Sequence, residues 1–415
     1  MSELRDRSRS SRRTQGVARH GRLRPASPWV LLLKIVGAAM AVVLFSGASV
    51  AAITAWRLNS QIKANSVELI GETDGPPPQI GAIPGGFNIL IVGSDTREGQ
   101  EGIGGEYEDE SGNLNDVNIL LHVSEDQTNA VAVSFPRDLV VDIPDCVDED
   151  GWAKPWSTEP LNTALYYGGL SCVVYTIETL TGLPIQFAGM ISFVGVINMS
   201  DAIGGVEVCT DGPVVDPYSG IDLPEAGYWT LQGFDALAFL RSRHGVGDGS
   251  DLTRISSQQV FLSSLVRKLK SEDTLGDVGK LIRLANVAAQ NLQLSTSLAN
   301  IDTMVSIALA LKNIPLERVT FVQYPGSTGG SGLYEGKVQP IQWAADELFS
   351  YIIADQPFQL PEAGDGRGST IDPNAPTEPV ESDASAPPVD NSELPVVEGV
   401  RGQTAADHTC SIANY

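Results

Sequence analysis

The sequence predicts an α/β protein: an α-β-α layered domain with a central mixed sheet, preceded by one N-terminal transmembrane helix. Three observations lead to this prediction. Short apolar runs alternate with segments of helical period between residues 85 and 355, which is typical of layered α/β domains. Several of these runs are apolar at nearly every position, so we expect a sheet covered on both faces. A run of 22 residues without charge, 35–56, precedes the domain.

The expected strands and helices follow from the apolar runs and the signals at their ends. Strands are expected at residues 87–93, 116–124, 128–135, 185–192, 206–210 and 318–324. A helix is expected at 161–180, where Gly182 and Pro184 end the pattern, and another between the fourth and fifth strands, ending at Gly204 and Gly205. A short helix at 235–240 leads into a loop at 241–249.

A long amphipathic helix is expected to begin near residue 251, capped by Ser250 or Asp251. Arg254 and Gln258 lie four residues apart on a stripe beside its apolar seam, so we expect both to face a cleft; an exposed stripe is the alternative. Further helix is expected to about residue 311. The seam recurs at intervals of three and four residues and consists of Leu252, Ile255, Gln259, Leu262, Val266 and Leu269.

The first 57 residues indicate where the domain is located. Residues 1–28 contain eight Arg against Glu3 and Asp6, a net charge of +6. As a helix, the uncharged run 35–56 would span roughly 33 Å, enough for the hydrocarbon core of a bilayer. The chain would then cross the plasma membrane once. By the positive-inside rule, the basic tail lies in the cytoplasm and the C-terminal part is extracellular. A cleaved signal peptide is the alternative, because residues 48–52 are small, but the long tail and long apolar run favour a retained anchor.

Composition divides the chain into five expected parts. They are a basic cytoplasmic tail at 1–28, the transmembrane helix at 29–57, a juxtamembrane stalk at 58–84, an extracellular domain at 85–355, and an acidic Pro-rich disordered linker with a short tail at 356–415. The linker is predicted because residues 356–400 are rich in Pro, Asp, Glu, Ser and Ala and have no apolar period. Cys410 could tie the last residues back onto the domain.

Charge and cysteines agree with an exported protein. The net charge of the chain is −24, and subtracting the +6 of residues 1–28 leaves −30 for residues 29–415, so we expect no nucleic acid partner. Four cysteines in an oxidising compartment suggest two disulfides, for which three pairings are possible. We expect Cys146 to pair with Cys172 and Cys209 with Cys410. The spacing contains no Cys-x-x-Cys, which argues against a zinc site.

The distribution of arginine points to an anion site. Between residues 71 and 260 the chain has 29 Asp and Glu but only six Lys and Arg. Five of the six are Arg97, Arg137, Arg241, Arg243 and Arg254, in compact polar clusters. Because the guanidinium group binds phosphate through two parallel hydrogen bonds, we expect these arginines to assemble one phosphate-binding site. The alternative is that each arginine neutralises a neighbouring carboxylate on the surface.

Carboxylates lie at the ends of the same strands. Asp95 follows the first predicted strand, Asp116 begins the second, and Arg137 and Asp138 follow the third, where Pro136 prevents a helix from starting. Asp95 and Asp116 are candidate ligands for Mg²⁺, which favours one or two carboxylates together with substrate phosphate. For each of them a turn-capping role is the alternative.

Five motifs, in this order, resemble the LytR-CpsA-Psr family over residues 85–270. They are Ser94-Asp95-Thr96-Arg97, Pro136-Arg137-Asp138, Asp201 with Gly204-Gly205, Arg241-Ser242-Arg243, and Asp251 with Arg254 and Gln258-Gln259. The cysteines and the loop after Arg243 resemble the actinobacterial branch. The resemblance implies a membrane-anchored phosphotransferase that moves an anionic or secondary cell-wall glycopolymer from a polyprenyl pyrophosphate carrier to the C6 hydroxyl of muramic acid in peptidoglycan. Polyprenyl phosphate would be released.

The resemblance also implies roles for particular residues. Asp95 and Asp116 would hold Mg²⁺, and Arg137, Arg241, Arg243 and Arg254, with Gln258, would bind the pyrophosphate. Arg97 would assist, and Asp251 would orient the arginines, with Asp138 as a further candidate for that role.

The sequence departs from the family pattern at two places and leaves two other functions open. At the positions of Leu114 and Pro160 many members of the family have a cation. Lys154 could supply the cation missing at Pro160 only if its loop folds back. A polyprenyl-pyrophosphate hydrolase and a non-catalytic cell-envelope regulator are the alternative functions.

Overall fold

The computed structural model describes residues 29–42, 45–46, 49, 63, 66–70, 85–95, 113–148, 151–271, 274–275, 277–375 and 393–414. The chain forms two compact units, Met1–Arg57 and Leu58–Tyr415. In the first unit, residues 29–42 are helical and exposed. Among the described residues no helix combines the length and the apolarity needed to cross a membrane. Much of the predicted transmembrane helix lies outside the described residues, so it stays a prediction.

A seven-stranded mixed sheet forms the centre of the second unit. Its strand order is β13-β8-β1-β2-β3-β14-β18. The pairs β1/β8 and β3/β14 are parallel and the other neighbours are antiparallel, so the predicted mixed sheet is confirmed. The strands are β1 (Phe87–Ser94), β2 (Asn115–Val123), β3 (Ala130–Phe135), β8 (Phe187–Ile191), β13 (Leu292–Leu294), β14 (Val319–Gln323) and β18 (Gly402–Thr404).

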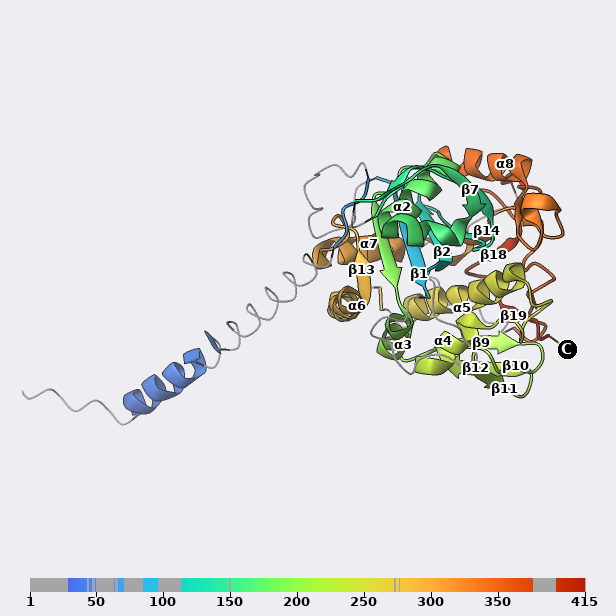
Figure 1. Cartoon of the computed structure of the whole chain (residues 1–415). Helices are drawn as coiled ribbons and strands as arrows, with labels where there is room; N and C mark the ends of the chain where they lie inside the picture. The colour runs from blue at the N-terminus through green and yellow to red at the C-terminus, as the bar shows by residue number, and fades with distance from the viewer. Residues whose placement is uncertain are drawn as a thin grey trace, which may run out of the picture. The chain divides into compact units, whose positions relative to one another are not determined.

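Helices cover both faces of this sheet (Figure 1). Alternate residues of β1 point to opposite faces: Leu90 packs with α2 (Ala164–Thr181) and α8 (Gln342–Ile353), whereas Ile89 packs with α7 (Ile301–Lys312) and α5 (Asp251–Ser271). Helix α6 (Val278–Asn291) packs against α7. Burial of each such aliphatic side chain contributes roughly 1.5–3 kcal/mol, which explains why the apolar runs form the core.

A second, four-stranded sheet lies on the other side of α5. Its order is β12-β9-β19-β17, with strands β9 (Val206–Thr210), β12 (Gly227–Leu231), β17 (Ser369–Ile371) and β19 (Thr409–Ser411). Buried side chains of β9 pack with α4 (Gly233–Arg241) and with Phe261 of α5. The predicted strand 206–210 therefore forms, but it belongs to this smaller sheet.

Most predicted elements are present within one to three residues of their expected ends. Between β8 and β9 lies α3 (Phe193–Ala202), and α6 and α7 extend the helical region to Lys312. The remaining elements are short and connect or cover these layers. They are β4 (Val140–Ile143), β5 (Cys146–Val147), β6 (Ala153–Lys154), β7 (Ser157–Pro160), β10 (Val214–Asp216), β11 (Ile221–Leu223), β15 (Gly326–Ser327), β16 (Gln339–Pro340), η1 (Leu161–Thr163), η2 (Leu316–Arg318) and η3 (Gly332–Tyr334).

The helix predicted at 161–180 is interrupted. It begins as the 3₁₀ turn η1 and then bends at Gly168 and Gly169, the second of which has a φ of +63°. A Cβ on Gly168 would lie 2.9 Å from the Cβ of Cys172 and 3.1 Å from that of Cys146. The two glycines thus allow the helix to pass close to the disulfide that these cysteines form.

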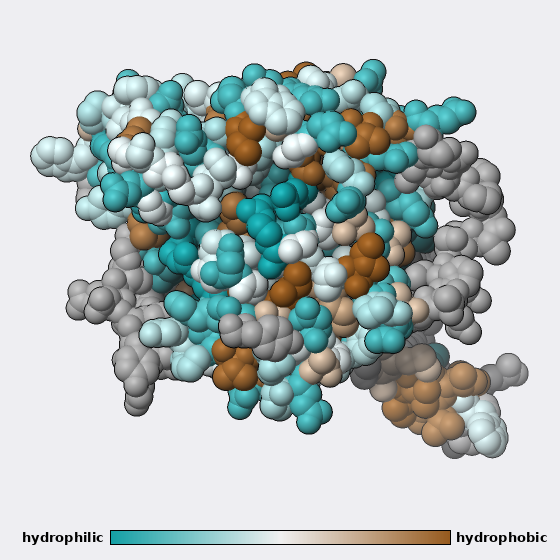
Figure 2. All heavy atoms as spheres, turned by 90° about the vertical axis from the view of Figure 1, so that its right-hand side faces the viewer, coloured by the Kyte–Doolittle hydropathy of each residue, from teal (hydrophilic) through white to brown (hydrophobic). Residues whose placement is uncertain are grey.

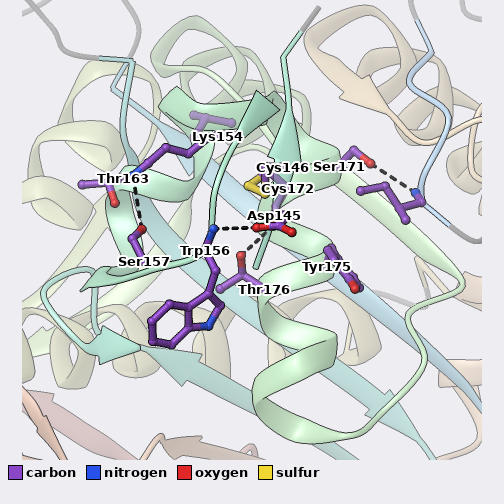
Figure 3. The surroundings of a disulfide bond; sticks show 12 residues. Asp145, Cys146, Lys154, Trp156, Ser157, Thr163, Ser171, Cys172, Tyr175 and Thr176 are labelled. Atoms are coloured by element: carbon purple, nitrogen blue, oxygen red, sulfur yellow. Dashed lines mark hydrogen bonds between the residues drawn. A yellow bond between two sulfur atoms is a disulfide. The ribbon is translucent and has the colours of Figure 1, made fainter. Parts of the chain in front are cut away.

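Both expected disulfides are present, Cys146–Cys172 and Cys209–Cys410. The first joins β5 to α2 (Figure 3). The second joins the neighbouring strands β9 and β19, so the C-terminal residues are tied to the body as expected.

The predicted domain end at residue 355 differs from the structure. Residues 356–375 and 393–414 belong to the folded unit: β18 pairs with β14 in the central sheet, and Phe358 and Val397 are buried. These segments fold without an apolar period, because backbone pairing and the Cys209–Cys410 disulfide hold them in place. Residues 376–392 of the predicted linker lie outside the described residues.

His122 of β2 gives a testable pH dependence. It is buried between Asn88, whose Oδ1 lies 2.8 Å from its Nδ1, and Asp355, whose Oδ1 lies 3.0 Å from its Nε2. Burial lowers the pKa of His122 below its ordinary value of 6.5, although Asp355 opposes this shift. The unfolded chain therefore takes up the proton at a higher pH than the folded chain. The contribution of His122 to stability is fully present above pH 6.5 and is lost as the pH falls through the folded pKa.

We expect urea unfolding at pH 5.5 to give a lower free energy of unfolding than at pH 7.5, and His122→Gln to reduce this difference. Burial also lowers the pKa of His408, so part of the pH dependence will remain in the variant. An unchanged pH difference in His122→Gln would contradict the assignment.

Candidate functional site

The predicted site residues come from chain segments that the fold brings together. Arg137 follows β3, Asp116 is the second residue of β2, and Asp251 begins α5. Arg241 ends α4, and Arg243 lies in the loop before α5. Figure 2 views the side of the unit on which β19 and the C-terminus lie, and strongly hydrophilic side chains gather in the middle of this face.

Asp251 is the centre of the arrangement. Its side chain is buried; Oδ1 lies 2.6 Å from Nη2 of Arg254, and Oδ2 accepts the backbone N–H of Arg137 at 3.0 Å. As the first residue of α5 it also lies at the positive end of the helix dipole, which stabilises a carboxylate. Ser250 precedes it as the cap, since its Oγ accepts the N–H of Thr253 at 3.4 Å.

Asp116 joins the same network from β2. Its Oδ1 lies 2.9 Å from Nη1 of Arg137, and its backbone carbonyl accepts a hydrogen bond from Nη2 of Arg254 at 2.8 Å. Burial disfavours the charge of Arg137, but Asp116, Asp251 and Asp138 outweigh it and raise the pKa of Arg137. The start of β2, the end of β3 and the start of α5 are thus held together by charged hydrogen bonds.

Arg243 is in a different electrostatic position. Burial, followed by the positive charges of Arg137 and Arg254, lowers the pKa of Arg243, because three cations share one region. The Nε atoms of these three arginines are buried and have no hydrogen-bond acceptor among the residues that the structure describes. A buried N–H without a partner is costly, so an anion bound at this position would stabilise all three groups.

The loop that carries Arg243 is held by a residue that was not predicted from the sequence. Asp216, at the end of β10, is 1% exposed, and its Oδ2 accepts the backbone N–H groups of Arg243 and His244, both at 3.0 Å. The hydroxyl of Ser242 donates to the same oxygen at 2.9 Å. The C-terminal residues support this loop from the other side, where Asn414 Nδ2 donates to the carbonyl of His244 at 2.9 Å. Nothing in the sequence pattern around Asp216 indicates this contact.

Arg241 and Gln258 connect α4 to its surroundings. The guanidinium carbon of Arg241 lies 4.3 Å from the ring centroid of Phe193, a cation–π contact. The side-chain N–H of Gln258 donates to the carbonyl of Leu240 at 2.9 Å, so its amide nitrogen links α5 to α4. The prediction that Gln258 faces inward agrees with its burial, but this contact gives the amide a positioning role.

Asp95 lies beside the start of β2. Its Oδ1 accepts the N–H of Leu114 at 2.7 Å, and its own N–H donates to the carbonyl of Leu114 at 3.1 Å, so the turn-capping contact is present. Ser94 and Asn115 are paired across the two strands, which brings the Asp95 and Asp116 segments side by side. Two carboxylates completed by phosphate oxygens fit the ligand preference of Mg²⁺. Arg97 lies outside the described residues.

Two lysines form ion pairs with carboxylates, and one of these carboxylates also lies beside Arg137. Lys337 was not predicted; its Nζ lies 3.3 Å from Oδ1 of Asp138, whose Oδ2 is 3.7 Å from Nε of Arg137. Lys154 folds back onto α2, with Nζ 4.0 Å from the ring centroid of Tyr167 and 3.1 Å from Glu159 Oε1. Lys337 lies two hundred residues from Arg137 in the sequence, so no local motif could have indicated the contact.

Replacing Asp251 tests the buried network. Asp251→Asn keeps the shape of the side chain but leaves the buried Arg254 without its carboxylate partner, and we expect a loss of about 3 kcal/mol of stability. Asp248→Asn is the matched control, since this exposed carboxylate in the same loop accepts hydrogen bonds from the N–H of Ser250 and the hydroxyl of Thr253. Guanidinium unfolding of both variants checks the prediction. Equal stability of the two would contradict the central role of Asp251.

Comparisons with known proteins identify the family of this chain. Residues 52–348 match the model of the LytR_cpsA_psr family. The chain is 30% identical over 311 residues to the cell wall biosynthesis protein LcpA of Corynebacterium glutamicum, covering 68% of this chain and 58% of LcpA. It is 26% identical over 337 residues to the polyisoprenyl-teichoic acid–peptidoglycan teichoic acid transferase TagT of Bacillus subtilis, covering 80% of this chain and 96% of TagT.

Solved structures show the same fold. The crystal structure of TagV from Bacillus subtilis superposes with a TM-score of 0.52 at 19% identity, covering 66% of this chain and 99% of TagV. The LytR-Csp2A-Psr enzyme from Actinomyces oris superposes with a TM-score of 0.50 at 23% identity, covering 69% of this chain and 96% of that chain. The family model spans most of the folded unit and includes every site residue predicted from the sequence, and the chain belongs to the LytR_cpsA_psr family.

Proposed function

We propose that this protein is a phosphotransferase that attaches an anionic or secondary cell-wall glycopolymer to peptidoglycan. The donor would be the glycopolymer on a polyprenyl pyrophosphate carrier, the acceptor the C6 hydroxyl of a muramic acid residue, and the second product polyprenyl phosphate. The observation that carries the proposal is the set of three buried Nε atoms of Arg137, Arg243 and Arg254 without acceptors among the described residues. A pyrophosphate has the oxygen atoms and the charge to satisfy them.

The names of the relatives support the same reaction class. LcpA is a cell wall biosynthesis protein, and TagT transfers teichoic acid to peptidoglycan. Because the match spans 58% of LcpA and the identities are low, the particular glycopolymer does not follow from these names. The basic tail and uncharged run at the N-terminus support anchoring in the plasma membrane, with the folded unit outside.

The residues can support the transfer as follows. Arg137, Arg243 and Arg254 bind the two phosphates and orient the phosphorus atom next to the sugar. The acceptor oxygen bonds to that phosphorus, the bond to the bridging oxygen breaks, and polyprenyl phosphate leaves with the bonding electrons while the hydroxyl proton passes to water. Arginine charge stabilises the departing phosphate, as in other phosphoryl transfers. Mg²⁺, held by Asp95 and Asp116 when bound, would neutralise further charge on the pyrophosphate.

The test uses the full chain in detergent with a polyprenyl pyrophosphate-linked oligosaccharide, Mg²⁺ and a peptidoglycan oligomer. Mass spectrometry follows polyprenyl phosphate release and the mass of the acceptor, with Arg243→Met as the inactive control and chelation of Mg²⁺ as a second one. A sugar phosphate on the acceptor, absent in both controls, is the expected result. Release without an adduct would identify a hydrolase, and binding without release a regulator.

A further inference from the structure

Large aromatic side chains are exposed on one part of the surface beside the candidate site. Trp152 is 76% exposed, Trp156 58% and Tyr166 66%. Exposed tryptophan is unusual in a soluble domain, because each indole gives up a large hydrophobic stabilisation by staying in water. All three residues lie between β5 and the first turn of α2.

Hydrogen bonds and a disulfide hold the described residues around the two tryptophans. The backbone N–H of Trp152 donates to Oδ1 of Asp148 at 2.7 Å, and that of Trp156 donates to Oδ1 of Asp145 at 2.6 Å. Between these two carboxylates in the sequence, Cys146 joins the hairpin to α2 through its disulfide. In Figure 3 the indole of Trp156 extends away from this disulfide. A rigid display of exposed rings lowers the entropy cost of binding a ligand to them.

The chain segment that carries these aromatic residues also contacts the arginine site. Lys154 lies over the ring of Tyr167, and that ring lies 5.6 Å from the ring of Tyr166 in an edge-to-face contact. The chain just before α2 then reaches the site, since the N–H of Asn162 donates to the carbonyl of Arg137 at 3.0 Å. Residue 162, within the segment that carries the exposed rings, is thus bonded to the backbone of Arg137.

The charged side chains around these rings indicate which class of ligand they could bind. Asp142, Asp145 and Asp148 lie on the same strands and turns, and Lys154 is already paired with Glu159. This negative surrounding disfavours phosphate-rich polymers and anionic lipid surfaces. It suits sugar rings without phosphate, whose hydroxyl groups donate to carboxylates while their C–H faces pack on the negative faces of aromatic rings.

We propose that Trp152, Trp156 and Tyr166 form an acceptor platform that binds the glycan strand of peptidoglycan. The inference rests on the proposed function for the identity of the acceptor, and it assigns the binding of that acceptor to residues outside the arginine site. The platform positions the glycan so that a sugar hydroxyl reaches the phosphates held beside Arg137.

Two measurements test the platform. In the transfer assay, Trp152→Ala, Trp156→Ala and Tyr166→Ala should each raise the KM for the peptidoglycan oligomer about tenfold, equivalent to about 1.4 kcal/mol, without changing the KM for the donor. In a binding assay without donor, the triple variant should lose binding of the full chain to purified insoluble peptidoglycan. Trp343→Ala is the matched control, because this tryptophan is 60% exposed on α8 and lies outside the platform.

The outcomes separate this inference from the proposed function. Binding that depends on the platform, in a protein without transferase activity, would support the platform and refute the transferase. Transfer by the triple variant with an unchanged acceptor KM would overturn the platform and leave the transferase intact. Loss of binding to phosphatidylcholine vesicles or to a teichoic acid, with peptidoglycan binding unchanged, would also overturn it.

Discussion

Replacing Arg243 by methionine is expected to reduce the transfer rate about 10³-fold without lowering the melting temperature. The side chain of Arg243 is partly buried, and burial together with Arg137 and Arg254 lowers its pKa, so its charge is unfavourable in the folded protein. Methionine keeps much of the side-chain volume and removes this repulsion. A group that costs stability but is needed for the reaction is typical of a functional site.

Arg267→Met is the matched control for this prediction. Arg267 is also an arginine of low exposure, but its Nη1 donates to the carbonyls of Ala405 and Asp407 at 2.9 and 2.8 Å. Its replacement should lower the melting temperature, because two carbonyls lose their donor, and should leave the transfer rate of the remaining folded protein nearly unchanged. Calorimetry and the mass spectrometric assay measure both quantities. Wild-type transfer by Arg243→Met would remove this arginine from the proposed mechanism.

Removing the Cys209–Cys410 disulfide is expected to cost about 5 kcal/mol of stability. The two cysteines are 201 residues apart, so the disulfide greatly restricts the unfolded chain. It also holds the strand that leads to Ile412 and Asn414, which contact the loop carrying Arg243. Loss of the disulfide should therefore affect the site as well as the fold.

The second disulfide provides the comparison. Cys146 and Cys172 are 26 residues apart, and their removal should cost less, about 3.5 kcal/mol. Guanidinium unfolding of the two double serine variants without reductant measures the difference. A larger loss from the Cys146–Cys172 variant would show that restriction of the unfolded chain is not the main source of the stabilisation. The hairpin carrying Trp152 and Trp156 would then stabilise the fold through its contacts in the folded state.

Elements whose sequence pattern is local were predicted well. Strands β1, β2 and β3 appear in the sequence as apolar runs, because both faces of the sheet are buried. Helix α5 is recognisable from the spacing of its apolar residues and from its cap at Ser250. The end of the domain was predicted wrongly because β17, β18 and β19 are short and polar. Their stability comes from pairing with distant strands, which leaves no period in the sequence.

In the candidate site, too, some features follow from local sequence and others only from the tertiary structure. By itself the sequence determined which arginines and carboxylates are available and that Asp116 and Arg137 lie at strand ends, because strand boundaries follow from local backbone preferences. The family resemblance implied that Asp251 orients the arginines. Only the tertiary structure decided that its partners are Arg137 and Arg254, that Asp216 holds the Arg243 loop, and that Lys337 reaches Asp138. Most of these contacts join residues tens to hundreds of positions apart, and they arise from the packing of whole layers, which no short stretch of sequence encodes.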